Sequence, residues 1–301
     1  MSFAENAVQV FRLLRSEDLR VLQVIETAMS KREFVPKEQI VKSAALPSDR
    51  VTYSLAELDK LGLIRQMKRP YLGYTLNYVG YDCLAINTFV KAGLIEEFGH
   101  KLGIGKEADV YDALTSEGKR VAVKFHRLGR PSFRQTRRKR SYSAERVGWL
   151  FQSRLAAEKE YSNMRLAYNV GVAVPEPLGQ NRHLVVMGMI EGGELTRWKN
   201  LVTPVRVLRR VMLNVRKAYL KAGVVHADLS EYNIIVEPNM KILIIDWPQA
   251  VRWDHPNARE LLARDVSCVL KFFARRFGTA AELGGVLDYV TGKNRSFETS
   301  A

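Results

Sequence analysis

The sequence of 301 residues contains little cysteine and no long apolar segment. Its two cysteines, Cys83 and Cys268, are far apart and form no CxxC pair, which argues against a disulfide framework and a thiolate zinc site. No apolar run approaches the ~20 residues that a membrane-spanning helix needs. The first residues also lack the basic start, apolar block and cleavage site of a signal peptide. We therefore expect a cytoplasmic protein without a membrane partner.

Acidic residues are also few, with 32 Asp and Glu against 47 Lys and Arg and a net charge of +15. This charge predicts a polyanionic partner, nucleic acid first, because each phosphate that Lys or Arg neutralises releases a bound counterion. A basic surface without a dedicated partner is the alternative. A hydrophobic fraction of 47% over this length predicts a folded chain with more than one core.

Residues 16–81 have the pattern of a winged helix-turn-helix. Helices are expected at 16–30, 36–46 and 48–62, the first and third capped by Ser16 and Ser48, and a hairpin formed by LIRQMKR and GYTLNY follows. The third helix of this fold commonly enters a nucleic-acid groove, so Arg50, Lys68 and Arg69 are expected to face nucleic acid. A protein-docking module of the same shape is the alternative.

A connecting helix is expected at 80–98, and three antiparallel strands follow at HKLGIG, ADVYDALT and RVAVKFHRL. After them comes a basic loop near 128–146, poor in apolar residues. It holds the run Arg137, Arg138, Lys139 and Arg140. We expect this run to contact phosphates, with a solvated linker as the alternative.

The turn GIGKEADVY at 103–111 lies between two expected strands and can cover phosphates. It comprises Gly103, Gly105, Lys106, Glu107 and Ala108. Glycines let the backbone approach a ligand, and Lys124 of the next strand can pair with phosphate charge. The turn is neither a Walker loop, since Glu follows its lysine, nor a Rossmann fingerprint, since a strand follows it. On the expected helix 149–169, Glu160 is favoured over Glu158 as the partner of Lys124.

The stretch VVHADLSEYNIIV places Asp228 and Asn233 five residues apart between apolar runs, and the hairpin NIIVEPNMKILIID brings Asp246 back beside Asn233. Phosphoryl transfer needs an acid near the attacking oxygen and hard oxygen ligands for magnesium. Asp228 is expected to orient or deprotonate the acceptor, while Asn233 and Asp246 hold the metal. His226 is interpreted as a packing residue that fixes the loop.

These motifs, together with IDWPQ and HPNARELLARDV, resemble those of the second subfamily of RIO kinases, which are atypical relatives of protein kinases. The winged helix sets this subfamily apart. The resemblance implies an α+β fold: a winged helix-turn-helix at 1–82, a connecting segment at 83–97, and a two-lobed kinase-like domain with its N-lobe at 98–187 and its C-lobe at 188–301. It also implies an adenine-contacting hinge at Met187, Met189 and Ile190.

The resemblance further implies an ATP-dependent ATPase or serine kinase, with magnesium or manganese, that acts in maturation of the small ribosomal subunit. Its partners would be the subunit precursor, the precursor's rRNA and other assembly proteins. Asp246 would also accept phosphate as an aspartyl-phosphate. The chain departs from the family at Ala108, where serine is usual, and in carrying HAD without the arginine through which activation-loop phosphorylation acts. Because only residues 247–301 follow Asp246, we expect ATP hydrolysis more than broad protein phosphorylation.

Two alternatives come from other classes of function. A small-molecule phosphotransferase of the aminoglycoside or choline type also uses an HxDxxxxN loop, but it has no evident need for a winged helix. A nucleic-acid-binding regulator with an inert kinase-like domain is the other. The intact set of Lys124, Asp228, Asn233 and Asp246 argues against an inert site.

Overall fold

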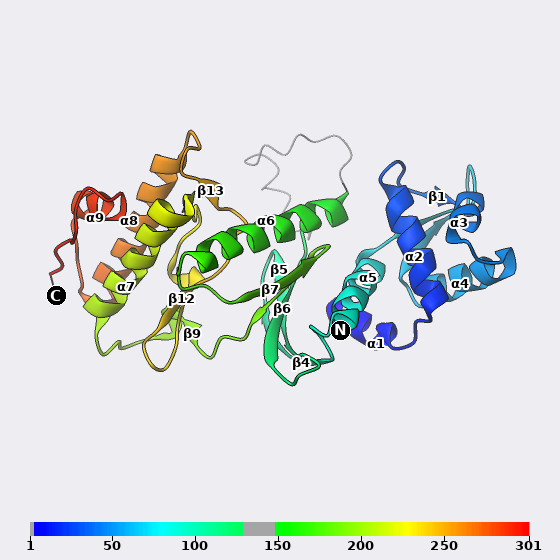
Figure 1. Cartoon of the computed structure of the whole chain (residues 1–301), viewed down its shortest axis with the longest axis horizontal. Helices are drawn as coiled ribbons and strands as arrows, with labels where there is room; N and C mark the ends of the chain where they lie inside the picture. Colours follow the sequence, from blue (N-terminus) through cyan, green and yellow to red (C-terminus); the bar gives the residue numbers. More distant parts are fainter. Residues whose placement is uncertain (1–2, 129–147, 301) are drawn as a thin grey trace. The chain divides into compact units, whose positions relative to one another are not determined.

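The computed structural model describes residues 3–128 and 148–300 (Figure 1). The chain divides into two compact units. Unit 1 comprises residues 1–155 and 179–186, and unit 2 comprises residues 156–178 and 187–301. The boundary passes through helix α6, Trp149–Asn169, and through strands β7, Pro177–Asn181, and β8, Leu184–Gly188. The expected mixture of helices and sheets is confirmed in both units.

The first part of unit 1 is the expected winged helix-turn-helix. Helices α2, Ser16–Met29, α3, Lys37–Ala44, and α4, Ser48–Lys60, pack around a core of Leu22, Ile25, Ile40, Leu55 and Leu58. Strands β2, Ile64–Met67, and β3, Gly73–Leu76, form the wing, and the short strand β1, Val35–Pro36, pairs with β3 on its other side. The fully buried positions follow the helical period of the sequence, which is why this domain could be predicted.

Two details of the first helices differ from the prediction. The caps expected at Ser16 and Ser48 are wrong by one position, because Arg15 and Pro47 occupy the N-caps. Arg15 and Asp18 form the cap of α2, with the Arg15 backbone N–H donating to Asp18 Oδ2 at 3.0 Å. The short helix α1, Phe3–Phe11, which packs against α5, was not predicted.

Helix α5, Tyr78–Lys91, was predicted as a connection, but it lies in the core of unit 1. Most of its side chains are buried, among them Val79, Cys83, Leu84, Ile86 and Phe89. The helix begins at an Asn77 cap whose side chain accepts a hydrogen bond from the Gly80 N–H at 3.2 Å. Helix α5 is apolar on several faces because it is buried on several faces.

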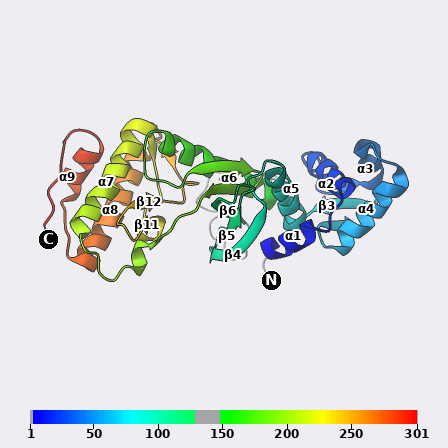
Figure 2. The same ribbon diagram turned by 60° about the horizontal axis from the view of Figure 1, so that its bottom comes forward.

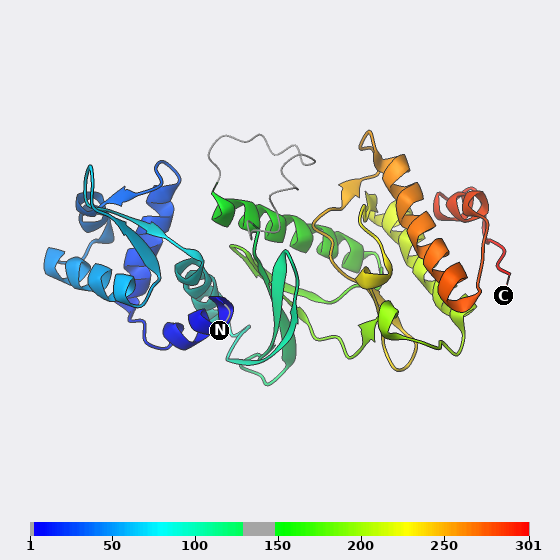
Figure 3. The ribbon, with the colours of Figure 1, turned by 180° about the vertical axis from the view of Figure 1, so that it is seen from behind.

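A five-stranded sheet in the order β4-β5-β6-β8-β7 completes unit 1 and extends across the boundary. Strands β4, Glu97–Ile104, β5, Ala108–Leu114, and β6, Arg120–His126, pair antiparallel as predicted, with Val110 opposite Lys124. Figure 3 shows this hairpin arrangement from behind. Register shifts in β4 between Phe98 and Gly103 bend the strand just before the glycine turn.

A buried ion cluster joins α5 to this sheet. The Arg127 guanidinium, 1% exposed, donates two hydrogen bonds of 2.6 Å to the fully buried carboxylate of Asp82. His183 Nε2 donates to the same carboxylate at 2.6 Å, and its ring stacks on Tyr81 at 4.8 Å. Asp109 Oδ2 lies 3.9 Å from Arg127 Nε. A bidentate pair is the geometry in which a buried charge is best tolerated, and it is present here although Arg127 Nε and His183 Nδ1 are buried without a hydrogen-bond partner among the described residues.

The cluster shifts the protonation of two members. Burial by itself would raise the pKa of Asp82, but the charge of Arg127 and the bonds from His183 and Arg127 outweigh it and hold that pKa below its ordinary value. Burial lowers the pKa of His183 to about 4 although Asp82 acts in the opposite direction. Asp82 is therefore a carboxylate and His183 a neutral ring at neutral pH.

Unit 2 is built on three helices: α7, Pro204–Lys217, α8, Ala258–Phe277, and α9, Leu283–Val290. They pack against one another (Figure 2). A π-helical turn at Ala218–Ala222 extends α7. Strands β11, Ile234–Val236, and β12, Ile242–Ile244, form the predicted antiparallel hairpin, and β9, Gly193–Glu194, pairs with β11. Strands β10, Val224–Val225, and β13, Val251–Arg252, form a second pair.

Candidate functional site

The acid and amide of the HADLSEYN motif lie on a short loop of unit 2 between β10 and β11. The loop ends in a 3-10 turn at Glu231–Asn233. The Asp228 side chain is 58% exposed, and Asn233 Nδ2 donates to the Asp228 carbonyl at 2.8 Å. This bond uses the amide nitrogen and leaves the Asn233 side-chain oxygen available as a ligand.

Asp246 follows the β11–β12 hairpin and lies beside this loop. Ile234 pairs with Ile244, and the Ile245 N–H donates to the Asn233 carbonyl at 3.0 Å. Asp246 itself is half-buried and has a φ of +69°, a left-handed conformation that aspartate adopts more readily than most residues. The structure therefore brings together Asp228, Asn233 and Asp246, as expected from the hairpin in the sequence.

Buried aromatic residues support the chain around Asp246. His226 Nε2 donates to the Ile245 carbonyl at 2.9 Å, and its ring lies 4.6 Å from the ring of Trp247. Trp247 Nε1 donates to the Ile244 carbonyl at 3.0 Å, and Asn163 of α6 donates to the Trp247 carbonyl at 3.1 Å. These bonds fix the backbone on both sides of Asp246.

Asp265 of α8 contacts the loop that carries Asp228, and it was not predicted from the sequence. Its buried carboxylate accepts hydrogen bonds from the N–H groups of Ala227 at 2.7 Å and Leu229 at 3.1 Å, on either side of Asp228. Ala227, with a φ of +66°, also accepts from Arg264, whose guanidinium lies 3.8 Å from the Asp228 carboxylate. An acid on the buried stripe of an otherwise apolar helix face was the available signal.

Burial raises the pKa of Asp265 to about 6, against the lowering effect of the two backbone N–H groups and Arg264. A carboxyl with a raised pKa binds its proton more tightly in the folded chain than in the unfolded one. Its charged form therefore costs stability at neutral pH, and this cost disappears as the pH falls below about 4. Asp265 positions the loop that carries Asp228, and its buried charge lowers the free energy of unfolding at neutral pH.

The residues beside the loop fit a magnesium ion. Asn233 and Asp246 offer one amide and one carboxylate oxygen, the hard ligands that magnesium prefers, and magnesium sites commonly use only one or two carboxylates plus phosphates and water. Across residues 3–128 and 148–300, no group of three or more His, Cys, Asp or Glu residues could hold a metal ion. The amide and carboxylate oxygens of Asn233 and Asp246 thus suit magnesium.

The predicted phosphate-covering residues lie together in unit 1. The Gly105 N–H donates to the Ala108 carbonyl at 2.7 Å and closes the turn. A Cβ atom at Gly103 would meet no described atom within 4 Å, whereas one at Gly105 would lie 3.2 Å from the Ala108 oxygen. Lys106 is exposed, Glu107 is half-buried, and its carbonyl accepts from the Arg127 N–H at 2.6 Å. Lys124 is half-buried in β6.

The remaining predicted nucleotide residues belong to unit 2. Glu160 of α6 is buried and Glu158 is half-exposed, which accords with the preference for Glu160 as an inward-facing acid. Lys124 belongs to unit 1, so its pairing with Glu160 stays a prediction. Met187 is buried at the end of β8, and Met189 and Ile190 are half-buried after it.

The predicted nucleic-acid contacts fall in two places. Arg50 of α4 is exposed and lies 3.5 Å from the Glu17 carboxylate, while Lys68 and Arg69 are exposed at the tip of the wing. The run Arg137, Arg138, Lys139 and Arg140 lies outside the described residues.

Comparison with known proteins places this arrangement in a family. Residues 109–284 match the RIO domain, and residues 11–92 match the N-terminal domain of Rio2. The chain is 40% identical over 254 residues to the RIO-type serine/threonine-protein kinase Rio2 of Methanocaldococcus jannaschii, covering 82% of this chain and 92% of that protein. This chain belongs to the Rio2 family of RIO-type serine/threonine-protein kinases. The resemblance noted in the sequence is thereby confirmed.

Other members of the Rio2 family agree with this assignment. The Rio2 kinase of Dictyostelium discoideum is 37% identical over 276 residues, which cover 91% of this chain but 53% of that protein. A crystal structure of the Rio2 kinase from Chaetomium thermophilum, in complex with ADP, Mg²⁺ and phosphoaspartate, has a TM-score of 0.83 at 33% identity. The match covers 96% of this chain and 93% of that one. The chain thus combines the two domains of the Rio2 family, the N-terminal winged helix and the RIO kinase domain.

We expect the Asp265→Asn variant of this Rio2-family kinase to lose activity without losing stability. Asn removes the charge whose burial is costly, but its single side-chain oxygen replaces the two carboxylate oxygens that accept from Ala227 and Leu229, so one of the two loop N–H groups loses its acceptor. Misplacing a catalytic group by about 1 Å can cost about 10²-fold in rate, so kcat should fall by about 10²-fold while the denaturant midpoint stays or rises. Glu282→Gln is the matched control, because Glu282 also accepts from two backbone N–H groups, those of Gly284 and Gly285. A stability loss in Asp265→Asn with unchanged kcat would contradict this role.

Proposed function

We propose that this chain transfers the γ-phosphoryl group of ATP with magnesium and acts as an ATP-driven switch in maturation of the small ribosomal subunit. The observation that carries this proposal is the loop in which hydrogen bonds hold Asn233 to Asp228 and Ile245 to Asn233, with Asp246 adjacent. Asp228 orients the attacking hydroxyl or water and takes up its proton. Asn233 and Asp246 hold the metal, which neutralises phosphate charge when bound.

We further propose that Asp246 itself accepts phosphate during hydrolysis. Its carboxylate is held on a backbone fixed by Trp247 and His226, which suits a nucleophile that must stay in line with the γ-phosphate. The attacking carboxylate oxygen forms the new P–O bond as the bond to ADP breaks, and water later releases the phosphate. The Chaetomium thermophilum relative is described with phosphoaspartate, which supports this step.

The proposed ribosomal docking rests on charge in the winged helix. Helix α4 carries Asp49, Glu57 and Asp59 against Arg50 and Lys60, and Arg50 already lies near Glu17, so this helix is a poor phosphate binder. The exposed wing residues Arg65, Lys68 and Arg69 are better placed for the phosphates of precursor rRNA, which proteins recognise by shape and backbone. The protein would act in the cytoplasm with other assembly proteins.

The test follows γ-labelled ATP with magnesium, in the presence and absence of small ribosomal subunits. The proposal expects phosphate release and a hydroxylamine-labile label on the protein, which is the signature of an acyl phosphate. The Asp246→Asn variant should lose the label. A label that resists hydroxylamine and remains in Asp246→Asn would point to serine phosphorylation instead. Phosphate release that is the same with and without subunits would contradict the switch.

A further inference from the structure

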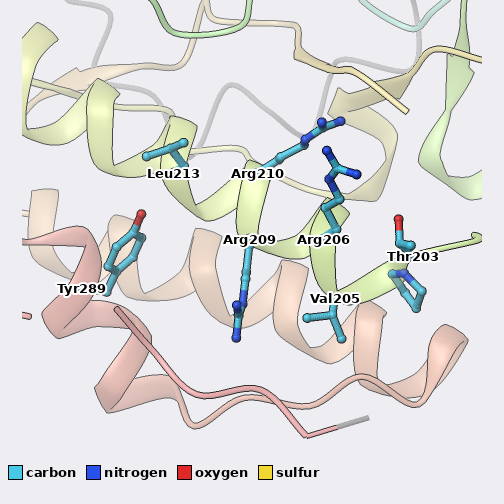
Figure 4. A pocket seen from close by; sticks show the side chains of 8 residues that line it. Thr203, Val205, Arg206, Arg209, Arg210, Leu213 and Tyr289 are labelled. Atoms are coloured by element: carbon cyan, nitrogen blue, oxygen red, sulfur yellow. The ribbon is translucent and has the colours of Figure 1, made fainter. Parts of the chain in front are cut away.

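A groove runs along α7 in unit 2 (Figure 4). Its cavity of about 690 Å³ is lined by Thr203, Pro204, Val205, Arg206, Arg209, Arg210, Leu213 and Tyr289. A second cavity of about 570 Å³ shares Arg209 and Tyr289 and continues along residues 295–299. The two cavities together form one surface channel, hereafter the α7 groove, between α7, the end of α9 and the segment 295–299.

Helix α7 is the source of strong positive charge in this groove. Its sequence PVRVLRRVMLNVRK contains five basic residues and no acid. Arg206, Arg209, Arg210 and Leu213 recur at helical spacing along the groove, and Figure 4 shows Arg209 extending on the opposite side of the helix from Arg206 and Arg210. Three of the five basic residues of α7, Arg206, Arg209 and Arg210, therefore line the groove and its two rims.

The described residues leave this charge largely uncompensated. Within residues 3–128 and 148–300, no carboxylate lies within 4.0 Å of Arg206, Arg209 or Arg210. Arg209 donates to Thr299 Oγ1 at 3.3 Å, and Arg210 donates to the Met240 carbonyl, which are neutral partners. Glu298 is the one acid that lines the described part of the groove. A chain-wide charge of +15 adds to the local field.

An aromatic ring is fixed in the same groove. The guanidinium of Arg216 lies 4.7 Å from the centre of the Tyr289 ring and donates to the carbonyls of Tyr289 and Asn294, the latter at 2.9 Å. The centre of the Phe297 ring lies 5.1 Å from that of Tyr289, with the two rings tilted by 53°. A positive channel that carries a fixed aromatic side chain is the combination that binds single-stranded nucleic acid, because the channel follows the backbone and a base can stack on the ring.

We propose that the α7 groove binds single-stranded RNA through its phosphodiester backbone. Arg206 and Arg210 on one rim and Arg209 on the other offer three guanidinium groups to a nucleic-acid backbone, and arginine forms bidentate bonds with phosphate oxygens. The groove differs in sign from α4, whose acids outnumber its bases, so the C-lobe supplies an RNA contact in addition to the one proposed for the wing. The inference rests on the proposed docking to rRNA, and it is independent of the catalytic loop.

The test compares the full-length protein with two charge-matched double variants. Arg206→Gln with Arg209→Gln removes two groove arginines, and Lys271→Gln with Arg276→Gln removes the same charge from exposed positions of α8 that do not line the groove. Binding of fluorescein-labelled oligouridylate is measured by anisotropy over a range of salt concentrations. Phosphate release from ATP is measured on the same preparations, and Arg206→Gln alone serves if the double groove variant is unstable.

The expected result is a change in the salt slope confined to the groove variant. Each phosphate contact to single-stranded RNA contributes about 0.7 to that slope, so removing two contacts should lower it by about 1.4. If binding at 1 M salt is unchanged, this corresponds to about 25-fold weaker binding at 0.1 M salt. The α8 control should bind like wild type, and phosphate release should be equal in all three proteins.

Three results would overturn the inference. Equal losses in the groove and α8 variants would mean that only net charge matters. An unchanged slope in the groove variant would place the contact elsewhere, such as the wing. Groove-dependent binding of polyglutamate without binding of the oligouridylate would assign the groove to an acidic peptide. If the proposed catalytic function is wrong, the wild-type protein will release no phosphate from ATP, and this result is independent of RNA binding.

Discussion

Replacing Asp228 with Asn is expected to lower phosphate release from ATP by about 10²- to 10⁴-fold, the usual contribution of a positioned acid or base. Asn keeps the shape of the side chain, but it cannot take up a proton from the attacking oxygen. Asn233 would still be held, because its bond goes to the backbone carbonyl of Asp228. The variant should therefore bind nucleotide with nearly unchanged affinity, and the loss should appear in kcat.

Asp254→Asn is a closely matched control for this experiment. The Asp254 side chain is 57% exposed and lies 3.4 Å from Arg252, while Asp228 is 58% exposed and lies 3.8 Å from Arg264. Both are exposed aspartates beside an arginine in unit 2, and such exposed pairs contribute little to stability. Phosphate release should be unchanged in Asp254→Asn. Equal rates in the two variants would mean that Asp228 has no part in the chemistry.

Replacing Arg127 with Met is expected to lower the free energy of unfolding of unit 1 by about 3–5 kcal/mol, because it leaves the buried Asp82 carboxylate without its partner. Replacing both partners, as in Asp82→Leu with Arg127→Met, should restore a large part of this loss, since no charge remains buried. Hydrogen exchange of amides in β5 and β6 measures the effect within unit 1. Arg182→Met is the control, because Arg182 pairs with Glu26 at 2.6 Å at a partly exposed site.

The same cluster predicts a pH dependence of stability. The unfolded chain protonates His183 near pH 6.5, whereas the folded chain does so near 4. Between these values the unfolded state binds more protons, so the free energy of unfolding falls as the pH is lowered from about 6.5 to about 4. The depressed pKa of Asp82 adds a loss in the same direction at lower pH. A similar cost for Arg127→Met and Arg182→Met, or stability of unit 1 that is flat over this range, would contradict the account.

The winged helix and the catalytic loop could be predicted because local pattern determines them. The helical spacing of apolar residues predicts α2, α3 and α4. The short turn between two strand-like runs predicts the wing strands β2 and β3. Asn233 and Asp246 are joined by one hairpin, so its register alone sets them side by side. The predicted caps of α2 and α4 were wrong by one residue, because the N-caps are Arg15, whose backbone N–H donates to Asp18, and Pro47.

Local pattern is therefore sufficient for segments whose partners are near in the chain, such as helices α2, α3 and α4, the hairpins and the order of the phosphoryl-transfer motifs. Contacts between residues far apart in the chain became visible in the folded structure. Asp265 reaches the Asp228 loop from a later helix, and Asp82, Arg127 and His183 meet from three distant segments. The α7 groove likewise needs α9 and residues 295–299. The physical reason is that such contacts depend on packing and burial, which act on side chains regardless of their spacing in the sequence.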